Sequence, residues 1–253
     1  MTPDLWSLAA LLALSFSSGL IDLSLGMGYG FTVTPVMLLL GYTTAETVPT
    51  VLFSSFIGGA TSSFFNHRLR NADFTPGGRD LKIALVTGGL GIVGAIIGVN
   101  TSLSLPERTV GLYIGALVIA SGALMLTSKS LISSFSWPKM TVISILGSFN
   151  KGISGSGFGP IITTGAIMSG LDEKTSVSIQ ALSETLVSLV GFATYTALKS
   201  QVNTPMIVAM SLGVTLASPF AATIVKKARG NTLKTMIGIL SLIVGASTLL
   251  KYI

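Results

Sequence analysis

The chain contains the same glycine-rich phrase twice. Gly26-Met27-Gly28-Tyr29-Gly30 recurs 129 residues later as Gly155-Ser156-Gly157-Phe158-Gly159. Residues downstream keep the same offset, as Ser54 and Ser183 do. Glycine-rich interruptions at corresponding places in two apolar halves indicate the duplication of a membrane-embedded unit. The sequence therefore predicts two structurally related halves.

Composition places both halves in a membrane. Of the 253 residues, 49% are hydrophobic and only 9% are charged. The apolar runs reach the roughly 20 residues that a helix needs to cross a hydrocarbon core. We therefore expect an all-α integral membrane protein. The chain has no cysteine, which excludes disulfides and thiolate chemistry.

Ten apolar segments divide equally between the halves. They fall at about 5–25, 31–41, 45–66, 82–101 and 108–128, and then at about 139–155, 160–170, 174–198, 204–225 and 233–252. We predict a first repeat over 1–128, a linker over 129–138 and a second repeat over 139–253, together forming one compact transmembrane domain. The second segment of each repeat is too short to cross a bilayer. We expect it to form a helical hairpin with the segment before it, with the glycine-rich tip inside the membrane.

Loop charges predict the orientation. One basic cluster lies between His67 and Lys82 and another between Lys226 and Lys234, and basic loops favour the cytoplasmic side of the inner (plasma) membrane. These loops are not equivalent in the two halves, so each half contains an odd number of membrane segments. The prediction is an inverted-topology repeat with both termini outside. Because the basic residues are scattered among loops, we predict no nucleic-acid partner.

The glycine tips favour an anion site. Alternating glycines let consecutive backbone N–H groups converge, and a helix that begins next adds its own unpaired N–H groups and the positive end of its dipole. Pro160 suits the first turn of such a helix. Glycines also serve as helix contacts, which is the interpretation for Gly91, Gly94 and Gly98. Duplication before two half-length segments favours binding at the tips.

A family resemblance is carried by these motifs. Gly19-Leu20 followed by Leu25-Gly26-Met27-Gly28-Tyr29-Gly30-Phe31, repeated as Gly152-Ile153-Ser154-Gly155-Ser156-Gly157-Phe158-Gly159-Pro160, resembles the TauE/SafE family of sulfite exporter-like transporters. The resemblance covers essentially the whole chain. It implies a secondary transporter of a small sulfur-containing oxyanion, such as sulfite, sulfoacetate or a related organosulfonate.

The predicted site combines the tips with neighbouring polar residues. The substrate-binding candidates are Ser24, Gly26, Gly28, Tyr29, Gly30, Thr32, Lys151, Ser154, Gly155, Ser156, Gly157, Phe158, Gly159 and Gln180. Ionisable residues in spans are rare and informative, which adds Asp22 and Glu184 as candidates for proton coupling.

The three buried charges allow two interpretations. Asp22 and Lys151 occupy equivalent positions, so the repeat would bring them together as a salt bridge, either as a permanent structural pair or with Lys151 attracting the anion. The position equivalent to Glu184 is Ser55, which offers no counterion, so we expect Glu184 to favour its protonated form and to carry the coupled proton.

Other functional classes fit poorly. The single histidine, the lack of Gly-x-Ser-x-Gly and the lack of His-Glu-x-x-His argue against an embedded hydrolase. We predict no enzyme activity, no cofactor and no metal. A passive anion channel remains the alternative. The expected partners are a small anion and the lipid bilayer, and the sequence leaves monomer and homodimer open.

Overall fold

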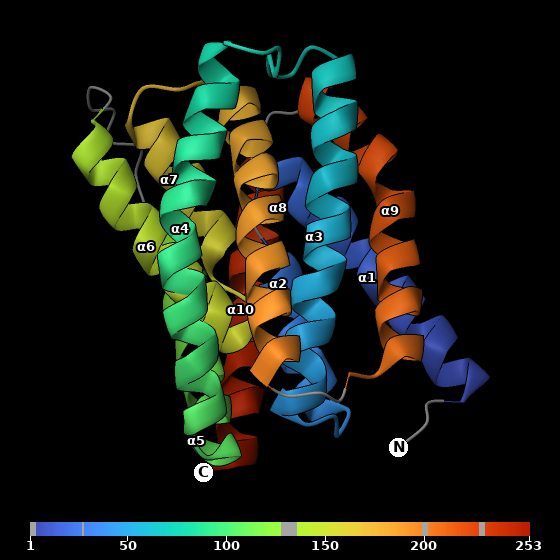
Figure 1. Ribbon diagram of the computed structural model, residues 1–253. Coiled ribbons are helices and arrows are strands. Elements are labelled where there is room, and N and C mark those ends of the chain that lie inside the picture. The colour runs from blue at the N-terminus through green and yellow to red at the C-terminus, as the bar shows by residue number, and fades with distance from the viewer. Residues whose placement is uncertain (1–3, 27, 128–135, 199–201, 228–230) are drawn as a thin grey trace.

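The computed structural model of the protein describes residues 4–26, 28–127, 136–198, 202–227 and 231–253 (Figure 1). These residues form helices and connections, without a strand. The helices are α1 (Leu5–Leu25), α2 (Tyr29–Leu39), α3 (Thr44–Arg68), α4 (Arg79–Ser104), α5 (Glu107–Thr127), α6 (Trp137–Ser154), α7 (Phe158–Met168), α8 (Glu173–Leu198), α9 (Thr204–Lys227) and α10 (Asn231–Tyr252). Each predicted apolar segment corresponds to one helix. Most of the predicted linker lies outside the described residues.

The two short helices begin two residues earlier than the sequence indicated. α2 begins at Tyr29 and α7 at Phe158, each directly after a glycine with positive φ that serves as the N-cap. Pro160 is consequently the third residue of α7 rather than the first. It is tolerated there because the first four N–H groups of a helix have no acceptor within the helix.

Within the described residues, five helices are long and apolar enough to cross a membrane, namely α1, α3, α4, α8 and α9. α2 and α7 contain only 11 residues each, about half the length that a spanning helix needs. The length and composition of these helices agree with an integral membrane protein.

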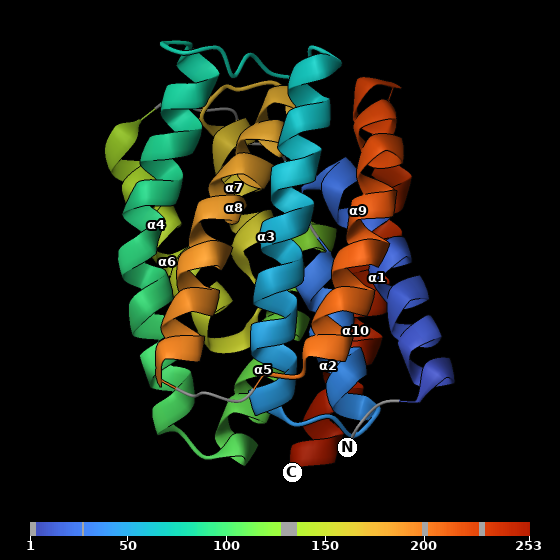
Figure 2. The same ribbon diagram turned by 45° about the vertical axis from the view of Figure 1, so that its right-hand side comes forward.

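The largest helix contacts join one helix from each half of the chain. α1 packs along α9 and α6 along α4, while α3 and α8 pack against each other in the middle of the bundle (Figures 1 and 2). α3 also contacts α9, as α8 contacts α4, and α5 pairs with α10. The contacts of α9 with α1 and with α3 thus have counterparts, α4 with α6 and α4 with α8, in which the halves are swapped.

Glycines allow the closest of these contacts. A Cβ on Gly98 of α4 would lie 3.0 Å from Cα of Gly152 in α6. Gly213 of α9 meets α1 similarly, since its Cβ would lie 2.9 Å from Cβ of Ser15. The predicted packing role of the glycine stripe on α4 is confirmed at Gly91, Gly94 and Gly98, which all face α6.

Both termini lie at one end of the bundle, and the connection between α3 and α4 lies at the other (Figures 1 and 2). Arg108, at the start of α5, holds the C-terminus at its end by donating hydrogen bonds to the carbonyl oxygens of Tyr252 (2.8 Å) and Ile253 (2.7 Å). At the opposite end, Leu171 between α7 and α8 packs against Ile83 near the start of α4. α2 therefore runs back toward the end with the termini, and α7 toward the opposite end.

Candidate functional site

The two glycine connections share positive φ values at both of their ends. Gly26 ends α1 with φ 70°, and Gly155 ends α6 with the same φ. The N-caps of the next helices, Gly28 and Gly157, have φ values of 133° and 90°. Side chains disfavour this left-handed region, so each connection depends on glycine at both of its ends. Met27 lies outside the described residues.

The two connections touch each other in the interior. The hydroxyl of Thr163, in α7, donates a hydrogen bond to the carbonyl oxygen of Gly26 at 2.9 Å. A Cβ on Gly30, in the first turn of α2, would lie only 2.7 Å from Cα of Ser156. Segments far apart in the sequence therefore meet where two short helices begin.

Several polar groups at this meeting point lack a protein partner. Neither Gly28 nor Gly157 supplies a side chain to cap the N-terminus of its helix. The hydroxyls of Ser156 and Thr34 are buried and form no hydrogen bond with the residues that the structure describes. The Asp22 carboxylate already accepts the backbone N–H of Tyr29. The positive ends of two helix dipoles and the free hydroxyls favour an anionic ligand.

A buried ion pair adjoins the second connection. Nζ of Lys151, in α6, lies 2.6 Å from Oε1 of Glu184, in α8, and donates a second hydrogen bond to Oγ of Ser55, in α3, at 2.8 Å. Gln180 donates through Nε2 to the other carboxylate oxygen of Glu184 at 2.6 Å. The backbone carbonyl oxygen of Lys151 accepts the N–H of Gly155 at 2.8 Å, so Lys151 lies in the last turn of α6 before the connection.

The predicted pairing of these charges is wrong. Lys151 binds Glu184 rather than Asp22, and Glu184, predicted to lack a counterion, has one. The central packing of α3 and α8 brings Ser55 and Glu184 together at Lys151. Asp22 is also buried, and it faces the charges of Glu184 and Lys151 and the backbone N–H of Tyr29. All three predicted ionisable residues therefore belong to one cluster.

The two aromatic residues of the glycine phrases differ in their surroundings. The Tyr29 hydroxyl donates to Ser54 of α3 at 2.8 Å and lies within hydrogen-bond distance of Ser15 of α1 at 2.9 Å. Phe158, at the equivalent position, packs in an apolar cluster with Ile162 and Val187. The first connection is thus anchored by hydrogen bonds and the second by apolar packing.

The other predicted residues divide between the connections and their own helices. Gly30 and Gly159 lie in the first turns of α2 and α7. Thr32, which follows in α2, is half-buried. Ser24 donates to the carbonyl oxygen of Leu20 at 2.5 Å within α1. Ser154 donates to Asn150 at 2.7 Å within α6, and its Oγ accepts the N–H of Ser156 at 3.0 Å. Ser24 therefore satisfies its own helix, whereas Ser154 shapes the second connection.

Sequence reasoning missed two polar partners of the site. Ser55 accepts a hydrogen bond from Lys151, and its equivalence to Glu184 was the signal that could have found it. Asn150 accepts a hydrogen bond from Tyr113 of α5, and a Cβ on Gly157 would lie 2.8 Å from Cβ of Asn150. No sequence pattern relates Tyr113 to Asn150, because that contact depends on how α5 packs.

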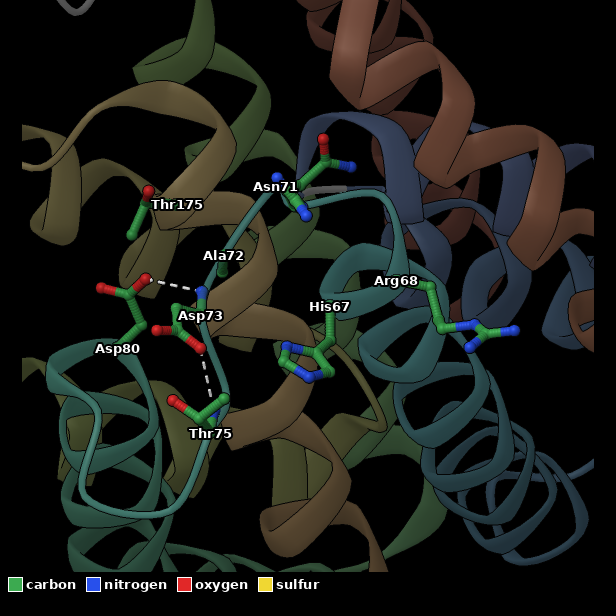
Figure 3. Close-up of a pocket in the computed structure, with 9 residues that line it drawn as sticks. His67, Arg68, Asn71, Ala72, Asp73, Thr75, Asp80 and Thr175 are labelled. Carbon is green, nitrogen blue, oxygen red and sulfur yellow. Dashed lines mark hydrogen bonds between the residues drawn. The ribbon is translucent and has the colours of Figure 1, made fainter.

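A separate pocket of about 650 Å³ opens at the end of the bundle opposite the termini (Figure 3). Its lining residues are His67, Arg68, Arg70, Asn71, Ala72, Asp73, Thr75, Asp80 and Thr175. Asp80 accepts the N–H of Asp73 at 2.9 Å, and Asp73 accepts the N–H of Thr75 at 3.0 Å. Hydrogen bonds donated by Thr75 lower the pKa of the Asp73 carboxyl group. These contacts fold the connection between α3 and α4 on itself, far along α8 from Glu184.

Comparison with known proteins agrees with a membrane protein. The sequence model of the family described as "Sulfite exporter TauE/SafE" matches residues 11–248. Among curated proteins, the chain is 26% identical over 247 residues to the "Probable membrane transporter protein YtnM" of Bacillus subtilis (strain 168), an alignment that covers 92% of this chain and 80% of that protein. No solved structure matches the chain significantly.

Proposed function

The chain belongs to the sulfite exporter TauE/SafE family, and from this premise we propose that it is a secondary transporter of a small sulfur-containing oxyanion. The substrate class that we propose comprises sulfite, sulfoacetate and related organosulfonates. The observation that carries the proposal is the contact between the two glycine connections beside the buried Lys151. It brings two helix N-termini and one cation to a single interior place.

The substrate site in this proposal lies between the connections. First-turn N–H groups of α7, and those of α2 beyond the Tyr29 N–H that Asp22 accepts, bind the anion's oxygens, and the free hydroxyls of Thr34 and Ser156 add further donors. The buried ammonium of Lys151 attracts the negative charge. Hydroxyl and backbone donors around a single cation suit a ligand that must also leave.

Alternating access is supported by how the halves pack. The contacts of α1 with α9 and of α6 with α4 are related by exchange of the halves, as two inverted repeats would require. We propose that residues 1–128 and 139–253 are these repeats and that α1–α2 and α6–α7 are hairpins entering from opposite sides of the membrane. The connections then form a fixed midpoint, which the rest of the bundle exposes to each side in turn.

We further propose that the protein lies in the inner (plasma) membrane with both termini outside. The termini share one end of the bundle, and the basic connection between α3 and α4 lies at the other. Under the positive-inside rule this basic end faces the cytoplasm.

Uphill transport is the test. Purified protein is reconstituted into liposomes with equal internal and external sulfoacetate, and a proton gradient is then imposed. A proton-coupled transporter accumulates sulfoacetate on one side, and an uncoupler abolishes the accumulation. A passive anion channel, the alternative function, only equilibrates the anion with the membrane potential. Equilibration that persists at zero membrane potential but never runs uphill would favour the channel.

A further inference from the structure

The Lys151 ammonium is positioned to exchange partners. It carries three N–H groups, and among the described residues it has two hydrogen-bond partners, Glu184 and Ser55. Asp22, Lys151 and Glu184 are the buried charged side chains of the described part of the chain. For an anion that enters this interior, the available cation is therefore Lys151, which is already paired with the Glu184 carboxylate.

Charge balance limits how the anion can enter. With both carboxyl groups ionised, the cluster of Asp22, Lys151 and Glu184 has a net charge of −1. Adding an anion without a compensating positive charge would place two excess negative charges in a poorly hydrated interior, where like charges repel strongly. A proton that binds with the anion removes this penalty.

Gln180 can stabilise either protonation state of Glu184. Its Nε2 donates to the carboxylate at 2.6 Å, while its Oε1 is buried and has no partner in the described part of the chain. Rotation of the amide by half a turn exchanges donor and acceptor, so Oε1 can accept the O–H of a protonated Glu184. The side chain that binds the carboxylate thus also supplies the acceptor that a carboxylic acid requires.

We propose that the transported anion displaces Glu184 from Lys151 and that Glu184 takes up one proton as it is displaced. The proton comes from water and binds a carboxylate oxygen, while Lys151 keeps its three protons and its charge. This inference rests on the proposed function and adds how proton and anion are coupled: the anion and the Glu184 carboxylate compete for Lys151, and a proton on Glu184 leaves the lysine to the anion.

Glu184 is the group that this geometry selects. The titratable side chains facing it are Asp22 from α1, Tyr29 from α2 and Lys151 from α6, and α3 contributes the hydroxyl of Ser55. The segments 83–104 of α4, 158–168 of α7 and 204–225 of α9 contain no titratable residue. Of the two carboxyl groups, only Glu184 contacts Lys151 directly, so only Glu184 loses its partner when an anion binds there.

The test counts protons on anion binding. Sulfoacetate stays fully ionised near neutral pH, so protons taken up during its binding belong to the protein. Calorimetric titrations in buffers of different ionisation enthalpy measure this number for the wild type, Glu184→Gln, Asp22→Asn and Glu173→Gln. Glu173 is an exposed carboxyl group at the start of the same helix and serves as the matched control.

The wild type and Glu173→Gln should take up about one proton per sulfoacetate, and their affinity should fall about tenfold for each unit of rising pH. Glu184→Gln should take up none and keep a constant affinity that exceeds the wild-type value at alkaline pH. Uptake that persists in Glu184→Gln, or is lost only in Asp22→Asn, overturns the inference and leaves the proposed function standing.

Two further outcomes are decisive. If Glu184→Gln does not fold, infrared difference spectra of the wild type must show a new carboxylic acid band when sulfoacetate binds, and its absence overturns the inference. Folded wild-type protein that does not bind sulfoacetate contradicts the proposed substrate class and this inference together.

Discussion

Lys151 in α6 and Glu184 in α8 form a buried salt bridge of 2.6 Å across the centre of the bundle. Their equivalents in the other half are Asp22 and Ser55, so the reversed arrangement of charges does not exist. The glycines at both ends of each connection have positive φ in both halves, whereas the charged residues differ between the halves. The buried charges of the cluster are therefore arranged asymmetrically around two similar connections.

Removing only one partner of this salt bridge should be costly. Lys151→Met leaves Glu184 buried without a counterion, which should reduce the stability by roughly 3 to 5 kcal/mol. The double variant Lys151→Met/Glu184→Gln has neither charge and should recover most of that loss. Thermal unfolding of the three proteins in one detergent checks this, and a double variant as unstable as Lys151→Met would contradict it.

The helices could be predicted from the sequence because apolar length and glycine punctuation are local signals. All ten apolar segments form helices, and the predicted α2 and α7 were displaced by two residues at both ends. There the decisive feature was the positive φ of Gly28 and Gly157, which ends the connection before the proline or apolar run begins.

The charge pairing could not be predicted in the same way. Equivalence under the repeat relates Asp22 to Lys151, but it does not state how far either lies from the axis that relates the halves. That distance depends on how α3, α6 and α8 pack, and this packing positions Glu184 and Ser55 at the ammonium. A repeat predicts which residues are equivalent, and only packing determines which of them touch.

The orientation of the bundle can be tested in this cysteine-free chain. Single cysteines are introduced at Arg70, between α3 and α4, and at Ile253, at the C-terminus. A membrane-impermeant thiol reagent should label position 253 in intact cells and position 70 only after permeabilisation. Labelling of position 70 from outside would reverse the proposed topology.

Tyr29→Phe separates anchoring from substrate binding. Ser15 and Ser54 keep backbone acceptors at Met210 (2.5 Å) and Thr50 (2.8 Å) without the phenol, so the loss of stability should be only about 1 kcal/mol. If the hydroxyl only anchors the first connection, the affinity for sulfoacetate should stay within about twofold of wild type. A larger loss of affinity at unchanged melting temperature would place the Tyr29 hydroxyl on the anion.

The glycine connections provide the most direct test of the substrate site. Gly28→Val and Gly157→Val each force a β-branched residue into positive φ, which costs about 1 to 2 kcal/mol and turns the neighbouring N–H groups away from the centre. Each change should weaken sulfoacetate binding at least tenfold, and by similar factors, because both glycines have positive φ and serve as the N-cap of a short helix.

Gly111→Val is the matched control, because a Cβ on Gly111 would meet the ring of Tyr252 where α5 packs against α10. This variant should lower the melting temperature but keep the affinity of the protein that remains folded. Affinities are compared only among monodisperse variants, so that loss of binding is not confused with loss of fold. Wild-type affinity in both Gly28→Val and Gly157→Val would mean that these glycines only permit packing. The anion would then have to bind away from the glycine connections.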